Sequence, residues 1–159
     1  MNPDIALQLA SADDAPEVAA LAGELLNEIM DTIGVQAFHF DRGETEARLL
    51  DFLAREKYFV FVARHPSAGA VGFVAMSESC ALYAEGVFGT VTELYVRPPF
   101  RSQRLGHALV EHARAFAAAR GWKRLEVTTP PLPEFNRTLA FYAREGFTIT
   151  GGRKLKLAL

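Results

Sequence analysis

Residues 103–108 read Gln-Arg-Leu-Gly-His-Ala and lie between an expected strand that ends at Pro98 and an expected helix that begins near Leu105. The first N–H groups of a helix have no acceptor within it, and the helix dipole makes this end positive. Gly106 has no side chain and Ala108 has a small one, so an anion can approach the backbone closely. The stretch therefore favours a small-anion site, although a plain helix start with a tolerated glycine explains it about as well.

Other phosphate-binding patterns do not fit this stretch. A P-loop requires G-x-x-x-x-G-K-[ST], which is absent, and a dinucleotide fingerprint requires three glycines where the chain has only Gly106. Arg97, Arg101 and Arg104 fall within eight residues. Such a cluster either adds positive charge to the rim of an anion site or is a solvated loop.

Hydrophobic patterns on either side of residues 103–108 alternate between strand and helix periods. Expected strands cover 5–9, 58–63, 70–76, 89–96, 125–129, 147–150 and 154–159. Expected helices cover 105–120 and 134–144, and two earlier helices contain the apolar residues between 18 and 29 and between 49 and 53. Turn residues between neighbouring strands favour antiparallel hairpins, and the strand–helix–strand unit from Val91 to Thr129 favours one parallel crossover. The chain shows no repeat or linker, so residues 1–159 are expected to form a single α/β domain.

Composition limits the class of protein. The chain has 159 residues, half of them hydrophobic, and a net charge of -2, which gives no electrostatic basis for binding nucleic acid. Cys80 is the single cysteine, and no apolar run approaches the ~20 residues of a membrane helix. The start of the chain does not read as a signal peptide, so we expect a cytoplasmic protein. His39, His65, His107 and His112 show no metal-ligand spacing, so no metal is expected.

Three segments together resemble the GNAT superfamily, the general-control-type N-acetyltransferases. Gln103-x-x-Gly106-x-Ala108 is similar to its Q/R-x-x-G-x-G/A signature, and Glu93 to Pro98 looks like its fourth strand. Residues 136–147 are similar to its Asn-x-x-Ala-x-x-Tyr-x-x-x-Gly-Phe segment. Two motifs in this order, about 30 residues apart, are far more specific than either alone.

The resemblance implies a mixed, mostly antiparallel sheet with splayed parallel fourth and fifth strands and helices on both faces. It also implies acetyl-CoA as co-substrate, with its pantetheine arm in the wedge between those strands. Main-chain groups of Leu94, Tyr95 and Val96 would contact that arm, and Asn136 would contact the arm or the loop around it. The expected pyrophosphate cradle consists of Arg101, Ser102, Gln103, Arg104, Leu105, Gly106, His107 and Ala108.

The implied reaction is direct acetyl transfer to a primary amine. An alkyl ammonium has a pKa near ~10, so a base usually removes its proton at neutral pH. Family carboxylates stand at the positions of Glu93 and Glu126, and a water chain or an already neutral amine is the remaining alternative. Tyr142 matches the family's tyrosine acid, while its alternative role is that of a packed aromatic residue.

Two departures from the family pattern stand out. Arg104 replaces a common glycine, and a Pro-rich loop lengthens the connection between Glu126 and Asn136. The acceptor is expected to be a small amine bound by the first two helices and by residues 81–88. A homodimer is common in the family. An idle acyl-CoA-binding module and a purely structural α/β domain are the competing interpretations.

Overall fold

The computed structural model describes residues 1–159 and contains one five-stranded sheet with the strands in chain order. The strands are β1 (Ala6–Leu9), β2 (Tyr58–His65), β3 (Gly69–Ala81), β4 (Gly86–Val96) and β5 (Leu125–Val127). β1 to β4 pair antiparallel, and β4 and β5 pair parallel. This is the mixed sheet predicted from the sequence.

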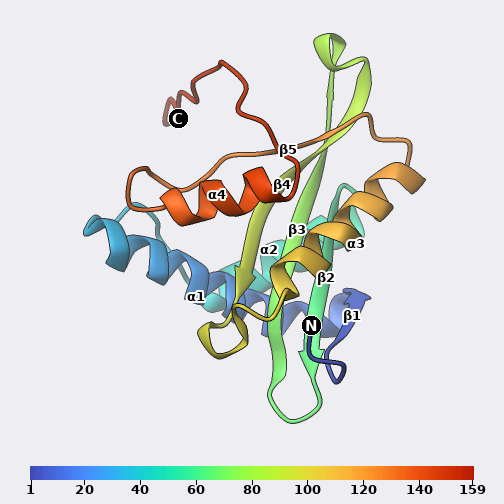
Figure 1. The fold of residues 1–159 in the computed structure, drawn as a ribbon, viewed down its shortest axis with the longest axis vertical. Coiled ribbons are helices and arrows are strands. Elements are labelled where there is room, and N and C mark those ends of the chain that lie inside the picture. The colour runs from blue at the N-terminus through green and yellow to red at the C-terminus, as the bar shows by residue number, and fades with distance from the viewer.

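Helices cover both faces of the sheet (Figure 1). The α-helices are α1 (Ala15–Ile33), α2 (Arg42–Ala54), α3 (Leu105–Ala119) and α4 (Asn136–Arg144). Short 3-10 turns cover Ala12–Asp14, Leu82–Ala84 and Pro98–Phe100. In Figure 1, α3 and α4 lie in front of the sheet, with α1 and α2 behind it. No helix is both long and apolar enough to cross a membrane.

Two hydrophobic clusters explain this layering. One joins α3, through residues such as Leu105 and Leu109, to Val74 and Val91 of the sheet. The other joins α1, through Val18 and Leu21, to the opposite side of the sheet. Each helix buries a stripe at helical spacing, and each strand sends alternate side chains to opposite faces.

Strand β4 contains the irregularity on which the site depends. Ala75 pairs with Glu93 and Met76 pairs with Val91, so Thr92 is an extra residue without a partner on β3. This is a β-bulge, which bends the strand and disturbs the alternation of its side chains. The parallel pairing with β5 ends at Val91, one residue before the bulge. β4 and β5 therefore part where the bulge begins.

The two strands predicted after α4 are wrong. Residues 147–159 form no strand, and they lie outside the sheet in Figure 1. Ile149, Leu155 and Leu157 are exposed. Alternation shows that a segment has an apolar side, but a strand also needs a hydrogen-bonding partner, and no segment pairs with the outer edge of β5.

Candidate active site

The loop before α3 presents several backbone N–H groups that have no hydrogen-bond acceptor within the protein. Ser102 and Arg104 both have left-handed backbone conformations, with φ of 62° and 63°. The first hydrogen bond into this turn comes from the N–H of Ala108, which donates to the carbonyl of Arg104 at 3.0 Å. The N–H groups of residues 102–107 donate to no group of the protein. Such a run of free amides at the start of a 15-residue helix has the chemistry of an anion cradle.

The positive φ of Arg104 gives a physical reason for the glycine that is common at this position. A left-handed conformation costs a residue with a side chain roughly 1–2 kcal/mol. The chain nevertheless adopts this turn with arginine. The departure from the family pattern therefore does not prevent the turn from forming. Its amide remains without an acceptor within the protein.

The three clustered arginines have different roles. Arg97 forms a bidentate pair with Glu24 of α1, with its shortest contact at 2.8 Å. Arg101 donates to the carbonyl of Val96 at 2.7 Å and pairs with Glu28 at 2.8 Å. Both therefore tie β4 and its loop to α1. Arg104 alone of the three makes no ion pair, so the prediction that Arg101 adds charge to the rim of the cradle is not supported by its contacts.

Beyond the bulge, β4 has backbone groups without a strand partner on one side. The N–H of Arg97 donates to Val71 on β3 at 2.9 Å. Backbone groups alternate in direction along an antiparallel strand, so those of Glu93 and Tyr95 also face β3. Those of Leu94 and Val96 face the opposite edge, which β5 has already left. This is the position that the resemblance assigned to the pantetheine arm.

Tyr142 lies on α4 and is buried, with its ring packed edge-on against Phe141 and Phe147. Its hydroxyl makes no hydrogen bond, and no fully buried side-chain oxygen lacks a partner, so the hydroxyl oxygen keeps some contact with solvent. Burial raises the pKa of Tyr142 to about 12. The phenol therefore stays protonated at neutral pH and can act as an acid. Asn136 begins α4 with an exposed side chain that makes no internal hydrogen bond.

Helix α4 contributes no residue to either core cluster and is attached to α3 instead. The ring of Phe141 packs over Gly106, where an added Cβ would lie only 3.2 Å from it. The carboxylate of Glu145, just after α4, lies 2.8 Å from Nδ1 of His107. Arg114 donates to the backbone carbonyl of Glu145 at 2.7 Å. Because Gly106 has no side chain, it allows α4 to pack closely against α3 and also leaves its own backbone accessible.

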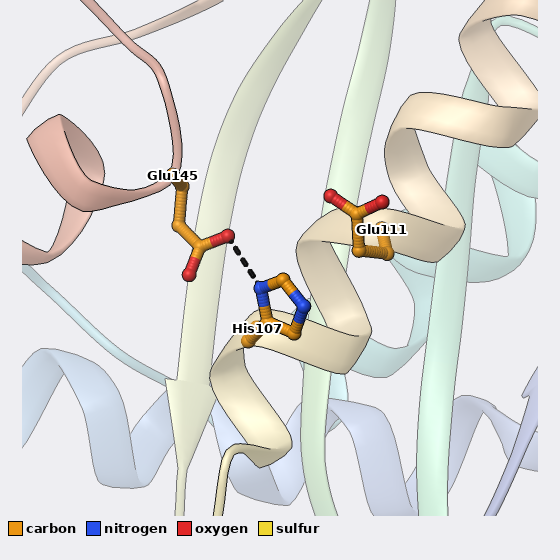
Figure 2. Close-up of side chains that lie close together, drawn as sticks. All are labelled: His107, Glu111 and Glu145. Carbon is orange, nitrogen blue, oxygen red and sulfur yellow. Dashed lines mark hydrogen bonds and ion pairs between the residues drawn. The ribbon is translucent and has the colours of Figure 1, made fainter.

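Figure 2 shows His107, Glu111 and Glu145 turned toward one another. Their candidate ligand atoms all lie within 4.8 Å of one another, so this group could hold a divalent metal ion. Spacing among the histidines alone did not reveal it because two of the three groups are carboxylates. His107 pairs with Glu145 across the contact between α3 and α4, whereas Glu111 pairs at 3.0 Å with Arg114 of its own helix. These contacts account for the three side chains without a metal.

Glu93 is fixed on the opposite face of the sheet from α3. Its Oε2 accepts hydrogen bonds from the hydroxyls of Tyr58 and Thr92. The Thr92 hydroxyl in turn lies 3.1 Å from that of Tyr58. The bulge allows this arrangement because it brings two consecutive side chains, Thr92 and Glu93, together. Oε1 of Glu93 has no partner in the protein and remains available to a substrate proton.

The second candidate base, Glu126, lies on β5 opposite Thr90. Its carboxylate pairs with Arg124 at 2.9 Å, and the Arg124 guanidinium also lies over the rings of Tyr83 and Phe88. Glu126 is thus engaged with an arginine, whereas Glu93 is held only by hydroxyl groups. The contacts favour Glu93.

A cavity of about 170 Å³ lies between α1, α2 and the sheet, and Glu93 lines it. The other lining residues are Val18, Ala19, Ala22, Leu26, His39, Thr45, Arg48, Leu49, Phe52, Tyr58 and Phe73. The two helices thus line it as expected, but no residue of 81–88 does. Tyr83 is exposed on the tip of the β3–β4 hairpin, and Phe88 is buried. That hairpin extends away from the helices (Figure 1).

Sequence reasoning missed Tyr58, Thr92 and Arg48. Thr45, Arg48, Leu49 and Phe52 are spaced as i, i+3, i+4 and i+7, and this pattern could have placed Arg48 on the inward stripe of α2. No local pattern links Tyr58 to Glu93, because β3 lies between their strands.

Comparisons with known proteins agree with this geometry. The family model described as an acetyltransferase (GNAT) domain matches residues 56–149. The chain is 31% identical over 147 residues to the aminoalkylphosphonate N-acetyltransferase of Salmonella typhimurium, covering 91% of this chain and 86% of the relative. The chain therefore belongs to the GNAT family of acetyltransferases. The same findings confirm the predicted class of enzyme, an N-acetyltransferase.

Solved structures show the same fold. An aminoglycoside acetyltransferase from an uncultured soil metagenomic sample, in complex with trehalose, has a TM-score of 0.78 and 18% identity, with 99% of this chain and 98% of that chain covered. A predicted acetyltransferase with acetyl-CoA from Clostridium acetobutylicum has a TM-score of 0.78 and 15% identity, with 97% and 96% covered. At these identities the likeness supports the architecture alone.

Proposed function

We propose that this protein transfers an acetyl group from acetyl-CoA directly to a small primary amine, without an acyl-enzyme and without a metal. The observation that carries the proposal is the run of free amides over residues 102–107, next to the point where β4 and β5 part. The amides suit a pyrophosphate, and the backbone of Leu94 and Val96 suits the amide groups of a pantetheine arm. Acetyl-CoA would supply the acetyl group as a thioester.

Glu93 acts as the base. The acceptor enters as an ammonium, and the carboxylate attracts it and takes up one proton, either directly or through a water molecule. The neutral nitrogen then attacks the thioester carbonyl, a C–N bond forms, and the C–S bond breaks. The nitrogen gives up its second proton to water, which balances the proton that the departing sulfur takes up. Because two hydroxyl groups fix Oε2, the free Oε1 keeps a defined direction toward the cavity.

Tyr142 acts as the acid and donates its hydroxyl proton to the departing sulfur. A thiol has a pKa of about 8.5, so this proton helps the reaction only moderately at neutral pH. An N–H of the splayed part of β4 stabilises the negative charge on the carbonyl oxygen, which typically contributes about 3 kcal/mol. Asn136, exposed at the start of α4, contacts the pantetheine arm.

The cavity supports a small acceptor. Its volume of about 170 Å³ is well below the roughly 300 Å³ at which pockets for drug-sized ligands begin. The aminoalkylphosphonate N-acetyltransferase of Salmonella typhimurium, the 31% identical relative, is named for a small amine acceptor. Both observations favour a small amine over a large one.

The test combines binding with turnover. Calorimetry should show acetyl-CoA binding to the purified protein, and a panel of small amines should release free CoA, measured with a thiol reagent. If acetyl-CoA does not bind, the proposal fails. If it binds but no amine releases CoA above the hydrolysis rate, the alternative of an idle acyl-CoA-binding module is favoured.

A further inference from the structure

The cavity beside Glu93 differs in character between its inner and outer ends. Phe73, Leu49 and Ala19 are buried, and they form an apolar interior next to the carboxylate. Arg48 and His39 also line the cavity, and because both are exposed they mark its solvent-facing end. A ligand in this cavity would meet a negative group inside and a positive group at the mouth.

Arg48 has no partner that accounts for its position. It makes no hydrogen bond and no ion pair within the protein, although Glu44 precedes it by four residues on α2, the spacing of a helical ion pair. By contrast, Arg55 on the same helix pairs with Asp51 at 3.0 Å. The guanidinium of Arg48 therefore keeps all its donors free at the mouth of the cavity.

A planar guanidinium with free donors matches a carboxylate or a phosphonate, since either anion accepts two parallel hydrogen bonds. The cavity also favours a small ligand. At about 30 Å³ per water molecule, 170 Å³ holds roughly six water-sized groups. A short carbon chain between a nitrogen at Glu93 and an anion at Arg48 suits this volume.

Resting on the proposed function, we infer that the acetyl acceptor is a short zwitterion, an aminoalkyl carboxylate or phosphonate, and that Arg48 determines this specificity by binding its anionic end. His39 lies at the same mouth and adds a second donor. The nitrogen then lies near Glu93, where its proton is removed. The opposite charges at the two ends of the cavity would fix the orientation of the acceptor as well as its affinity.

The test compares Arg48→Gln with the wild type on four acceptors of similar length: an aminoalkyl carboxylate, an aminoalkyl phosphonate, an uncharged alkylamine and a diamine. A hydrogen bond to a charged group contributes about 1.5–3 kcal/mol, so kcat/KM for the preferred zwitterion should fall about 10- to 100-fold in the variant. The loss should lie mainly in KM. Activity on the uncharged amine should change less than about threefold, because it makes no contact with Arg48.

Two matched variants sharpen the test. Arg42→Gln removes an exposed arginine of the same helix outside the cavity and should leave all four activities unchanged. Arg48→Lys keeps the charge without the two-pronged geometry and should restore only part of the affinity. Circular dichroism and thermal melting check the fold of each variant.

The outcomes separate the two proposals. If the wild type prefers the uncharged amine or the diamine, or if Arg48→Gln lowers all four activities equally, the zwitterion inference is overturned while the acetyltransferase proposal stands. If no acceptor is acetylated by the wild type, the proposed function itself fails. A preference between carboxylate and phosphonate identifies which anion the enzyme uses.

Discussion

The two sides of strand β4 form the proposed site in different ways. On the coenzyme side, the candidate contacts are backbone groups of residues 102–107 and of Leu94 and Val96. On the acceptor side, they are the side chains of Glu93, Tyr58 and Arg48, which come from three elements. In this proposal, the site for the constant ligand is built from main chain, whereas the site that selects among acceptors depends on individual side chains. Substitutions should therefore have larger effects on the acceptor side.

Glu93→Gln should have the largest effect. Losing the base should lower kcat/KM about 10²- to 10⁴-fold near neutral pH, with the free energy of acetyl-CoA binding nearly unchanged. The difference in kcat/KM between the wild type and Glu93→Gln should become smaller toward about pH 10, because much of an alkyl amine is already neutral there. Glu126→Gln is the matched control and should retain most activity. A large loss there instead would move the base to β5.

Tyr142→Phe should lower kcat about 10- to 100-fold, less than the loss of Glu93, because a thiolate leaves fairly well without an acid. With its pKa raised to about 12, Tyr142 stays protonated throughout the usual assay range. Its ionisation should therefore not cause a decline in rate below about pH 11. Pre-steady-state measurement of the acetyl transfer step tests this, and an unchanged rate would leave Tyr142 as a packing residue.

Glu145→Ala should have an intermediate effect, because Glu145 positions α4 and hence Tyr142. Loss of its hydrogen bond with His107 should destabilise the fold by about 1 kcal/mol and lower kcat a few-fold, with little change in KM for the acceptor. The readouts are thermal unfolding and steady-state kinetics. A metal chelator should leave the wild-type rate unchanged. If a chelator instead lowers the wild-type rate as much as Glu145→Ala does, His107, Glu111 and Glu145 hold a metal ion.

Arg104→Gly should have the smallest effect on activity and should raise stability. Relief of the left-handed conformation should stabilise the fold by about 1 kcal/mol. Since the cradle consists of amides, the Kd for acetyl-CoA should change less than about tenfold. Calorimetry gives this Kd and denaturant unfolding gives the stability. A much larger loss of binding would show that the coenzyme side also depends on a side chain.

The prediction from sequence was more complete for the coenzyme side. Gly106, Ala108 and the start of α3 lie within a few residues of one another, and the conformation of such a turn is set mainly by local preferences. The acceptor cavity was found only in outline, because Arg48 and Tyr58 reach it from elements far apart in the chain.

Long-range contacts also decide features that local patterns leave open. Arg101, expected at the rim of the cradle, pairs with Glu28 of α1 and donates to the carbonyl of Val96, and no local pattern predicts these contacts. Residues 154–159 alternate as a strand does, yet the alternation does not specify a partner. Tyr83 and Phe88 are the aromatic residues of 81–88, and neither lines the cavity: Tyr83 is exposed at the hairpin tip and Phe88 is buried.

The sequence by itself determined the order of the elements up to α4, the start of α3 near Leu105 and the position of Tyr142 on α4, because these depend on short-range periodicity and turn chemistry. Only the tertiary structure decided that Thr92 is a bulge, that Tyr58 and Thr92 fix Glu93, and that Arg48 stands free at the mouth of the cavity. These features depend on which strands pair and which side chains find partners, and such contacts are settled by packing between segments distant in the chain.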